Sequence, residues 1–169
     1  MERTWILVGM MGAGKSSVGR LLAERAGREF ADTDTILIGR LGRTIPQIFR
    51  LYGEQAFRDH ETSVLRNLAP GRLVLATGGG TVLRPENWDE MRRLGTTLYL
   101  QASPETLIGR LERTRHRRPL LIADDWQDRI VELLERRQPF YEQADYVVNV
   151  DNLSTDETAE KVYRTVEPE

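Results

Sequence analysis

The stretch G-M-M-G-A-G-K-S at residues 9–16 decides the fold of this chain. It fits the phosphate-binding pattern G-x-x-x-x-G-K-[ST], in which glycines let successive backbone N–H groups surround a phosphate. The context agrees with the motif, because residues 5–8 read as a buried strand and residues 16–26 have the apolar spacing of a helix. A strand, a phosphate-binding loop and a helix N-terminus in this order predict a nucleotide site in an α/β domain.

The side chains of this loop have separate expected duties. We expect the Lys15 ammonium to reach the β- and γ-phosphates, and the Ser16 hydroxyl to ligate Mg²⁺ that accompanies ATP. The residues of the loop that we expect to contact the nucleotide are Gly12, Ala13, Gly14, Lys15, Ser16 and Ser17.

Short apolar runs alternate with helical patterns along the rest of the chain. Strands are predicted at 5–8, 29–31, 72–76, 97–100 and 146–150, and helices at 16–26, 45–52, 54–68, 86–94 and 125–137, with a last helix capped by Ser154 and Glu157. Nearly continuous apolar strands joined by helices indicate a parallel sheet that is covered on both faces. The predicted fold class is α/β, a three-layer α/β/α P-loop NTPase with a central five-stranded parallel sheet.

Composition limits the broad class of the protein. The chain has 169 residues, 40% hydrophobic and 30% charged, a net charge of −2 and no cysteine. We therefore expect a single domain spanning residues 1–169, without disulfides or thiolate metal sites. No apolar run is long enough to span a bilayer, and no signal peptide is recognisable at the N-terminus. We expect a cytoplasmic monomer with no nucleic-acid or membrane partner.

Two carboxylates stand one residue apart in F-A-D-T-D-T-I at residues 30–36. If a strand continued through them, Asp32 and Asp34 would project from one face. P-loop enzymes usually place an acidic Mg²⁺ partner at the end of another apolar strand, but the run L-V-L-A-T at 73–77 ends without an acid. Asp32 is therefore the candidate on the metal side, directly or through a water, and capping of a helix or turn is the alternative.

Several features would suit an acceptor that carries a carboxylate, and each also has a simpler explanation. A T-G-G-G segment at 77–80 permits close backbone approach to a ligand, although a tight turn explains it equally well. Arg58 and Glu61 can pair on one helix face, which is usually just a surface ion pair. Arg136 and Arg137 end another helix before a proline. Two arginines at a glycine loop would suit a carboxylate, but sequence spacing alone does not bring them together.

The segment R-L-E-R-T-R-H-R-R-P-L-L-I-A-D at 110–124 is strongly basic. A solvated helix face and a nucleic-acid patch are the simple alternatives, and the second has little aromatic support. In a P-loop kinase such a segment is expected to be a mobile lid, here about residues 112–125. Its arginines would close over the phosphates and exclude water.

Taken together, these motifs resemble those of the shikimate kinase family over nearly the whole chain. The matching segments, in chain order, are G-M-M-G-A-G-K-S at 9–16, D-T-D at 32–34, G-E-Q-A-F-R-D-H-E at 53–61, T-G-G-G at 77–80, R-R-P-L-L at 117–121 and R-Q-P-F-Y-E-Q-A-D at 137–145. Each is modest alone, and the six in order are highly specific. The resemblance implies a fold like that of nucleoside monophosphate kinases and transfer of the ATP γ-phosphoryl group to the 3-hydroxyl of shikimate, in aromatic amino-acid biosynthesis.

The family pattern also implies roles for individual residues, with Lys15, Asp34 and Arg118 as the catalytic set. The resemblance places Ser16 and Asp32 on Mg²⁺, Arg110 against the adenine and Arg118 on the nucleotide phosphates. It places Phe49 and Phe57 on the wall of the shikimate pocket. The residues that it places on shikimate itself are Asp34, Arg58, Gly79, Gly80 and Arg137. The departures from the pattern are small. Phe140 replaces a common leucine, Arg117 stands beside Arg118, and residues 152–154 give no match for the adenine contact.

Two alternatives to a shikimate kinase remain open at this point. Another small-metabolite kinase of the same build, such as a gluconate kinase, would also act on a carboxylate-bearing acceptor. A nucleotide-dependent binding or regulatory module would use the basic segment to meet a partner.

Overall fold

Five parallel strands form the centre of the molecule in this computed structural model, which describes residues 2–114, 116 and 121–167. The strands are β1 (Thr4–Val8), β2 (Glu29–Asp32), β3 (Leu73–Ala76), β4 (Gly95–Gln101) and β5 (Tyr146–Asn149). They lie in the order β2-β3-β1-β4-β5, so the strand that leads into the phosphate-binding loop is central. Every residue of β1 is buried, as expected for a strand covered on both faces.

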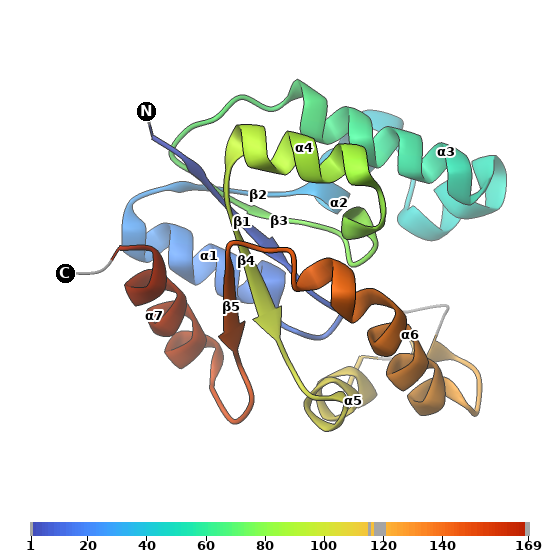
Figure 1. The fold of residues 1–169 in the computed structure, drawn as a ribbon. Coiled ribbons are helices and arrows are strands. Elements are labelled where there is room, and N and C mark those ends of the chain that lie inside the picture. Colours follow the sequence, from blue (N-terminus) through green and yellow to red (C-terminus); the bar gives the residue numbers. More distant parts are fainter. Residues whose placement is uncertain (1, 115, 117–120, 168–169) are drawn as a thin grey trace.

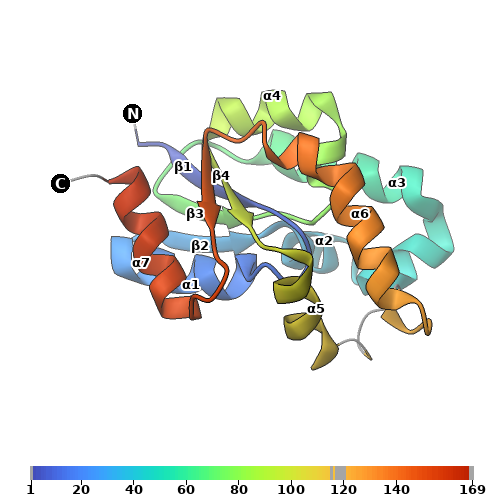
Figure 2. The same ribbon diagram turned by 60° about the horizontal axis from the view of Figure 1, so that its bottom comes forward.

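Helices cover both faces of this sheet, as the sequence predicts. They are α1 (Lys15–Ala26), α2 (Thr33–Leu41), α3 (Ile45–Asn67), α4 (Pro85–Leu94), α5 (Pro104–Glu112), α6 (Trp126–Tyr141) and α7 (Thr155–Val166), with a short 3₁₀ turn, η1 (Thr81–Leu83). Helices α1 and α7 pack together on one face, and α4 lies on the other with α3 against it (Figures 1 and 2). The three-layer α/β/α prediction is confirmed.

The buried side chains form two separate groups. The large one fills the space between the sheet and its covering helices. The small one joins α2 to α3 and consists of Leu37, Ile48, Phe57 and Val64. The helices that carry Asp34 and Arg58 therefore share a core of their own, beside the main one.

Most predicted elements are present, with ends shifted by one or two residues. Gly27 ends α1 in the left-handed conformation (φ 61°), and its N–H group donates to the carbonyl oxygens of Ala23 and Glu24. Ser154 and Glu157 form the capping box at the start of α7. The predicted break between two helices at Gly53 is also found, as a non-helical residue (φ 83°, ψ 172°) inside α3.

Three predictions about elements were incomplete or wrong. Helices α2 and α5 were not predicted, although Asp32 and Ser103 cap them at their N-termini. The expected helix end before Pro139 is wrong, because α6 continues to Tyr141 with Pro139 inside it. A proline within a helix removes one backbone hydrogen bond, and here Arg137 and Tyr141 of the flanking turns are buried.

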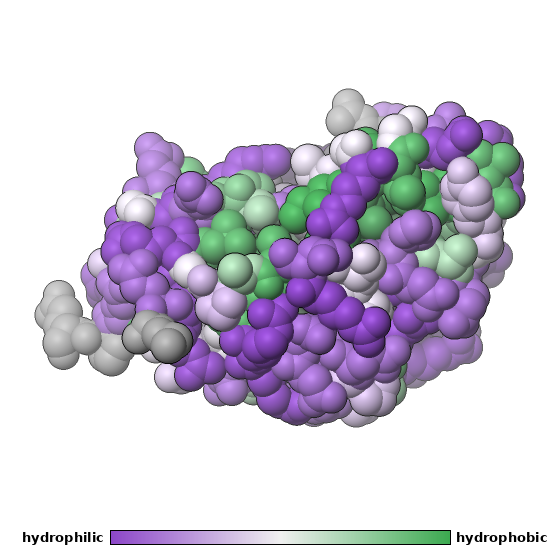
Figure 3. Space-filling view, turned by 90° about the horizontal axis from the view of Figure 1, so that it is seen from above, coloured by the Kyte–Doolittle hydropathy of each residue, from purple (hydrophilic) through white to green (hydrophobic). Residues whose placement is uncertain are grey.

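Seen from above, hydrophilic residues cover most of the visible face, and hydrophobic residues gather in a band across it (Figure 3). Within the described ranges no helix has the length and apolar character needed to cross a bilayer.

Candidate active site

A polar cavity of about 320 Å³ lies at the carboxyl ends of β1, β2 and β3, where ligands of open α/β sheets bind. Its walls come from the phosphate-binding loop, from the start of α2 and from the glycine segment after β3. The lining residues are Met11, Gly12, Gly14, Lys15, Ser16, Ser17, Asp32, Asp34, Thr77, Gly78 and Gly79. We call this space the phosphate cavity.

The backbone of the phosphate-binding loop takes conformations that favour glycine. Gly12 (φ 85°) and Gly14 (φ 98°) both have strongly positive φ, and Gly14 is the N-cap of α1. A Cβ atom on Gly12 would also lie 2.8 Å from Cγ of Leu111, which is too close. The loop therefore directs the N-terminus of α1 into the phosphate cavity, where its partial positive charge favours an anion.

Lys15 is buried in this loop, and its ammonium group donates to the carbonyl oxygens of Gly9 (2.6 Å) and Met10 (2.9 Å). Arg110 comes from α5 and donates to the carbonyl oxygens of Ala13 (2.9 Å) and Leu153 (3.3 Å). Arg110 thus joins the loop to residues 150–153, which overlap the segment 152–154 that has no match to the family pattern.

Asp32 uses its two carboxylate oxygens for different partners. Oδ2 accepts a hydrogen bond from the Ser16 hydroxyl at 2.6 Å. Oδ1 accepts from the backbone N–H groups of Asp34 (2.9 Å) and Thr35 (3.4 Å), so Asp32 is the N-cap of α2. Asp32 therefore does cap a helix, as the alternative proposed. Its second oxygen, Oδ2, remains directed at Ser16, the residue expected to bind the metal.

The assumption that Asp32 and Asp34 share one face of a strand is wrong. β2 ends at Asp32 and α2 begins at Thr33, so Asp34 lies in the first turn of a helix. Both residues nevertheless line the phosphate cavity.

The Ser16–Asp32 pair fits a magnesium site. Mg²⁺ in nucleotide-binding proteins typically takes one or two protein oxygen ligands and completes its shell with phosphate oxygens and water. Within the described ranges no group of three or more His, Cys, Asp or Glu side chains could hold a metal ion, so an all-protein cage is absent there. A hydroxyl and a carboxylate oxygen at the edge of the phosphate cavity are the donor set that such a shared site requires.

Asp34 stands in an unusual electrostatic environment. Burial, and then repulsion by Asp32 and Glu61, raises its pKa to about 6, although Lys15 and Arg58 act in the opposite direction. Its Oδ1 atom is buried and has no hydrogen-bond partner among the residues that the structure describes. A buried acceptor without a partner is uncommon in folded proteins, and a group with a pKa near neutrality can exchange a proton at physiological pH.

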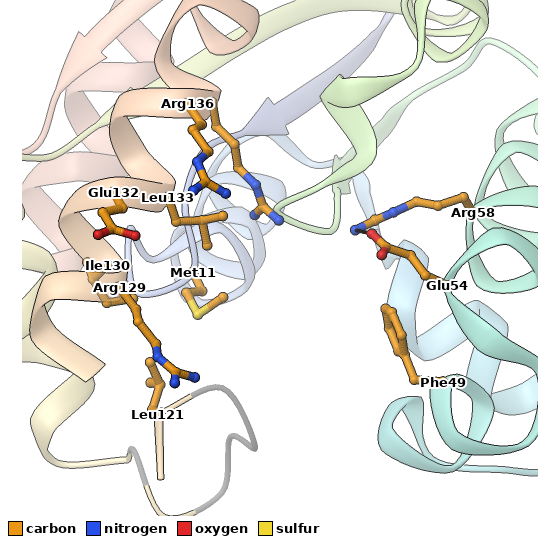
Figure 4. Close-up of a pocket in the computed structure, with 11 residues that line it drawn as sticks. Met11, Phe49, Glu54, Arg58, Leu121, Arg129, Ile130, Glu132, Leu133 and Arg136 are labelled. Atoms are coloured by element: carbon orange, nitrogen blue, oxygen red, sulfur yellow. Dashed lines mark ion pairs between the residues drawn. The ribbon is translucent and has the colours of Figure 1, made fainter. Parts of the chain in front are cut away.

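A second cavity, of about 470 Å³, opens beside the first. One wall is α6, and the opposite wall is the part of α3 that carries Phe49, Glu54 and Arg58 (Figure 4). Met11 of the phosphate-binding loop lines both cavities, so they adjoin at this residue. We call the second space the acceptor cavity.

Two arginines from different helices meet at the glycine segment. A Cβ atom on Gly80 would lie 2.4 Å from Nη2 of Arg58, and one on Gly79 would lie 3.0 Å from Nη1 of Arg137. Both guanidinium groups also line the acceptor cavity. The structure therefore brings together the arginines and the glycine loop that sequence spacing left apart. Within the described residues the N–H groups of Gly79 and Gly80 make no hydrogen bond.

The surroundings of the two arginines differ. Arg58 donates to Glu61, which is fully buried, at 3.0 Å. Arg137 is only 9% exposed, and its Nε atom has no partner in the described part of the chain. A nearly buried cation with an unsatisfied donor is a favourable place for an anionic group.

The predicted aromatic wall is present in part. Phe49 faces the acceptor cavity, whereas Phe57 packs behind it, with ring centroids 4.4 Å apart, and belongs to the small core. Arg117 and Arg118, and with them the expected lid contact, lie outside the described residues.

Some contacts of the site have no signal in the sequence. Glu61 also accepts a hydrogen bond from the Thr81 hydroxyl at 2.8 Å, and Thr33 accepts one from the Gly78 N–H group at 3.1 Å. These contacts join positions far apart in the chain, so only the folded structure reveals them.

Comparison with known proteins identifies the family of the chain. The family model described as "Shikimate kinase" matches residues 11–167. A shikimate kinase from Thermodesulfovibrio yellowstonii is 40% identical over 163 residues, which cover 96% of this chain and 94% of the relative. The solved structure of a shikimate kinase from Acinetobacter baumannii in complex with shikimate superposes with a TM-score of 0.91 at 38% identity, covering 98% of this chain and 93% of that one.

A gluconokinase from Sinorhizobium meliloti 1021 is more distant, with 21% identity and a TM-score of 0.57, and this likeness shows a shared fold alone. The family model and the relative at 40% identity both extend over nearly the whole chain. The chain belongs to the shikimate kinase family.

Proposed function

We propose that this chain transfers the γ-phosphoryl group of ATP to the 3-hydroxyl of shikimate, giving shikimate 3-phosphate and ADP. The observation that carries the proposal is the pair of adjoining cavities, one built on the phosphate-binding loop and one on two arginines at a glycine loop. The A. baumannii relative, solved with shikimate, has the same fold over nearly the whole chain. We place the reaction in the route to aromatic amino acids and the enzyme in the cytoplasm, as a monomer with small-molecule partners only.

On the donor side, the loop residues Gly12 to Ser17 hold the phosphates by backbone N–H groups and the N-terminus of α1. Lys15 exchanges its carbonyl partners for phosphate oxygens when the nucleotide binds. Arg110 packs against the adenine, since it already joins the loop to residues 150–153. We expect Arg118, in the lid of about residues 112–125, to contact the nucleotide phosphates.

On the acceptor side, Arg58, Arg137 and the backbone of Gly79 and Gly80 bind the carboxylate of shikimate. Arginine offers paired donors that match the two oxygens of a carboxylate. Phe49 provides the apolar wall for the ring, and Phe57 supports Phe49 from behind.

Asp34 activates the acceptor. Its Oδ1, unpaired among the described residues, accepts a hydrogen bond from the attacking hydroxyl and takes the proton as the oxygen bonds to the γ-phosphorus. The bond from that phosphorus to the bridging oxygen breaks on the opposite side, and ADP leaves. Most of the acceleration comes from alignment of the two substrates and neutralisation of phosphate charge.

Ser16 and Asp32 would hold Mg²⁺ together with the nucleotide. Bound there, the ion neutralises charge on the phosphate oxygens. Asp32 also fixes the first turn of α2 and hence the position of Asp34.

An acceptor screen tests this proposal. Purified protein is incubated with ATP, Mg²⁺ and shikimate or gluconate, and the products are analysed by ³¹P and ¹H NMR. We expect a phosphomonoester on the 3-hydroxyl of shikimate and no product from gluconate. Phosphorylation of gluconate, or of another hydroxyl of shikimate, would refute the assignment.

A further inference from the structure

The last turns of α6 carry two side chains toward the glycine loop. Arg137 and Tyr141 are four residues apart and so lie on the same helix face. Pro139 stands between them and has no N–H group, which removes one backbone hydrogen bond from this part of the helix. The orientation of the turns around Pro139 therefore depends more than usual on side-chain contacts.

Tyr141 makes the contact that fixes this end of the helix. The side chain is fully buried, and its hydroxyl donates to the carbonyl oxygen of Gly79 at 2.7 Å. Its ring stacks on that of Tyr99, with centroids 5.0 Å apart and planes 22° apart. Burial raises the pKa of Tyr141, and the charge and side-chain hydrogen bond of Arg137 lower it.

The bond to Gly79 also determines the direction of a second group. The carbonyl of Gly79 and the N–H of Gly80 belong to one planar trans peptide unit, so they point in opposite directions. A peptide between two glycines can rotate at little steric cost. Holding the carbonyl on the Tyr141 side therefore holds the Gly80 N–H group on the other side, where it has no partner within the described residues.

From these contacts we infer that Tyr141 is a positioning residue for the acceptor, an inference that rests on the function proposed above. Its hydroxyl sets the orientation of the Gly79–Gly80 peptide and holds that peptide against the helix that carries Arg137. One side chain thus aligns two groups assigned to the carboxylate, a backbone N–H and a guanidinium, without touching the substrate itself.

A purely structural role is the alternative, since the Tyr141 ring belongs to the main core. Tyr141→Phe separates the two, because it keeps the ring and removes the hydroxyl. Tyr99→Phe is the matched control. It removes a hydroxyl from the other ring of the same stack, and that hydroxyl makes no hydrogen bond within the described part of the chain.

The test measures KM for shikimate and for ATP, the dissociation constant of shikimate without nucleotide, and the unfolding temperature. For Tyr141→Phe we expect KM and the dissociation constant for shikimate to rise roughly 5- to 20-fold, the effect of losing one buried hydrogen bond. We expect KM for ATP to change less than about twofold, and Tyr99→Phe to match the wild type in all substrate constants.

Three results would overturn the inference: unchanged shikimate constants in Tyr141→Phe, equal changes for shikimate and ATP, or the same change in Tyr99→Phe. A lower unfolding temperature with unchanged shikimate constants would assign Tyr141 to the core alone. If the wild-type protein neither bound nor phosphorylated shikimate, the proposed function itself would fail. If the wild type were active and Tyr141→Phe had the same constants, only the inference about Tyr141 would fail.

Discussion

Asp32 shows how one side chain serves both the fold and the site. Oδ1 caps α2 and Oδ2 accepts from Ser16, so the carboxylate connects the start of one helix to the start of another. The sequence supported the metal role by elimination, because β3 ends without an acid. It could not divide the two oxygens between partners, since that division depends on the unpredicted α2.

Substitutions at Asp32 should separate these two duties. Asn keeps a capping oxygen but removes the charge. We therefore expect the unfolding free energy of Asp32→Asn to lie within about 1 kcal/mol of the wild-type value. Affinity for Mg²⁺–ATP should nevertheless fall at least about tenfold. Asp32→Ala should show the same fall in affinity for Mg²⁺–ATP. Its unfolding free energy should lie a further ~1 kcal/mol below that of Asp32→Asn, because the cap is lost. Chemical denaturation and nucleotide titration measure the two effects, and normal Mg²⁺–ATP affinity in both variants would remove Asp32 from the metal site.

The raised pKa of Asp34 makes a kinetic prediction. Because its pKa is about 6, the ionised form required of a base accumulates only above that pH. We expect kcat/KM for shikimate to rise with pH and level off above about 7, with an apparent pKa near 6.

Asp34→Asn should lower kcat by about 10²-fold or more and leave ATP affinity nearly unchanged. A pH–rate profile with both proteins checks this. Wild-type turnover in Asp34→Asn would exclude Asp34 as the base.

The same pKa makes a prediction about stability. The folded state holds the Asp34 proton up to about pH 6, whereas the unfolded chain releases it near the ordinary value of 3.8. The contribution of Asp34 to the unfolding free energy is therefore fully present below about pH 4, and it is lost as the pH rises through about 6.

Each pKa unit is worth about 1.4 kcal/mol, so Asp34→Asn should gain up to about 3 kcal/mol relative to the wild type between pH 4 and pH 7. Denaturation of the ligand-free proteins at both pH values measures this difference. An identical difference at both pH values would contradict it.

At the scale of elements, α2 and α3 behave as one unit with a small core. This core lies on the helices that carry Asp34 and Arg58 and packs against Phe49, and among the described residues it includes none from the phosphate-binding loop. We therefore expect its integrity to matter more for the acceptor than for the nucleotide.

Leu37→Ala tests this division, because Leu37 is 1% exposed and lies in the small core. We expect a loss of about 2–5 kcal/mol in unfolding free energy and a larger rise in KM for shikimate than for ATP. Leu94→Ala, an equally buried leucine of α4 in the main core, is the control. Leu94→Ala should lose a similar amount of unfolding free energy, with equal changes in KM for shikimate and for ATP. The same shikimate-to-ATP ratio of KM changes in both variants would contradict the account.

The sequence predicted most elements because apolar periodicity is a local signal. It missed α2, whose run T-D-T-I-L-I contains four β-branched residues with low helix propensity, so the Asp32 cap and packing of Leu37 decide the outcome. It missed α5 despite a Ser103 cap followed by proline at the first helical position. The end of α6 was misplaced because Pro139 is a strong local signal that tertiary contacts override.

At the scale of the whole molecule, the sheet places the two substrates. The central position of β1, with β3 on one side and β4 on the other, puts the phosphate-binding loop in the middle of the binding edge. The sequence predicted this edge from the rule for parallel sheets. It could not predict the strand order, nor the meeting of Arg58 and Arg137 at the glycine loop, because both depend on contacts between distant parts of the chain.

The central claim is that this edge brings ATP and shikimate together for direct transfer. The most direct test is the rate of ADP release in a coupled assay with ATP and Mg²⁺, with and without shikimate. We predict rapid ADP release that saturates with shikimate and nearly vanishes without it. ADP release at the same rate in the absence of shikimate, or none in its presence, would contradict the account.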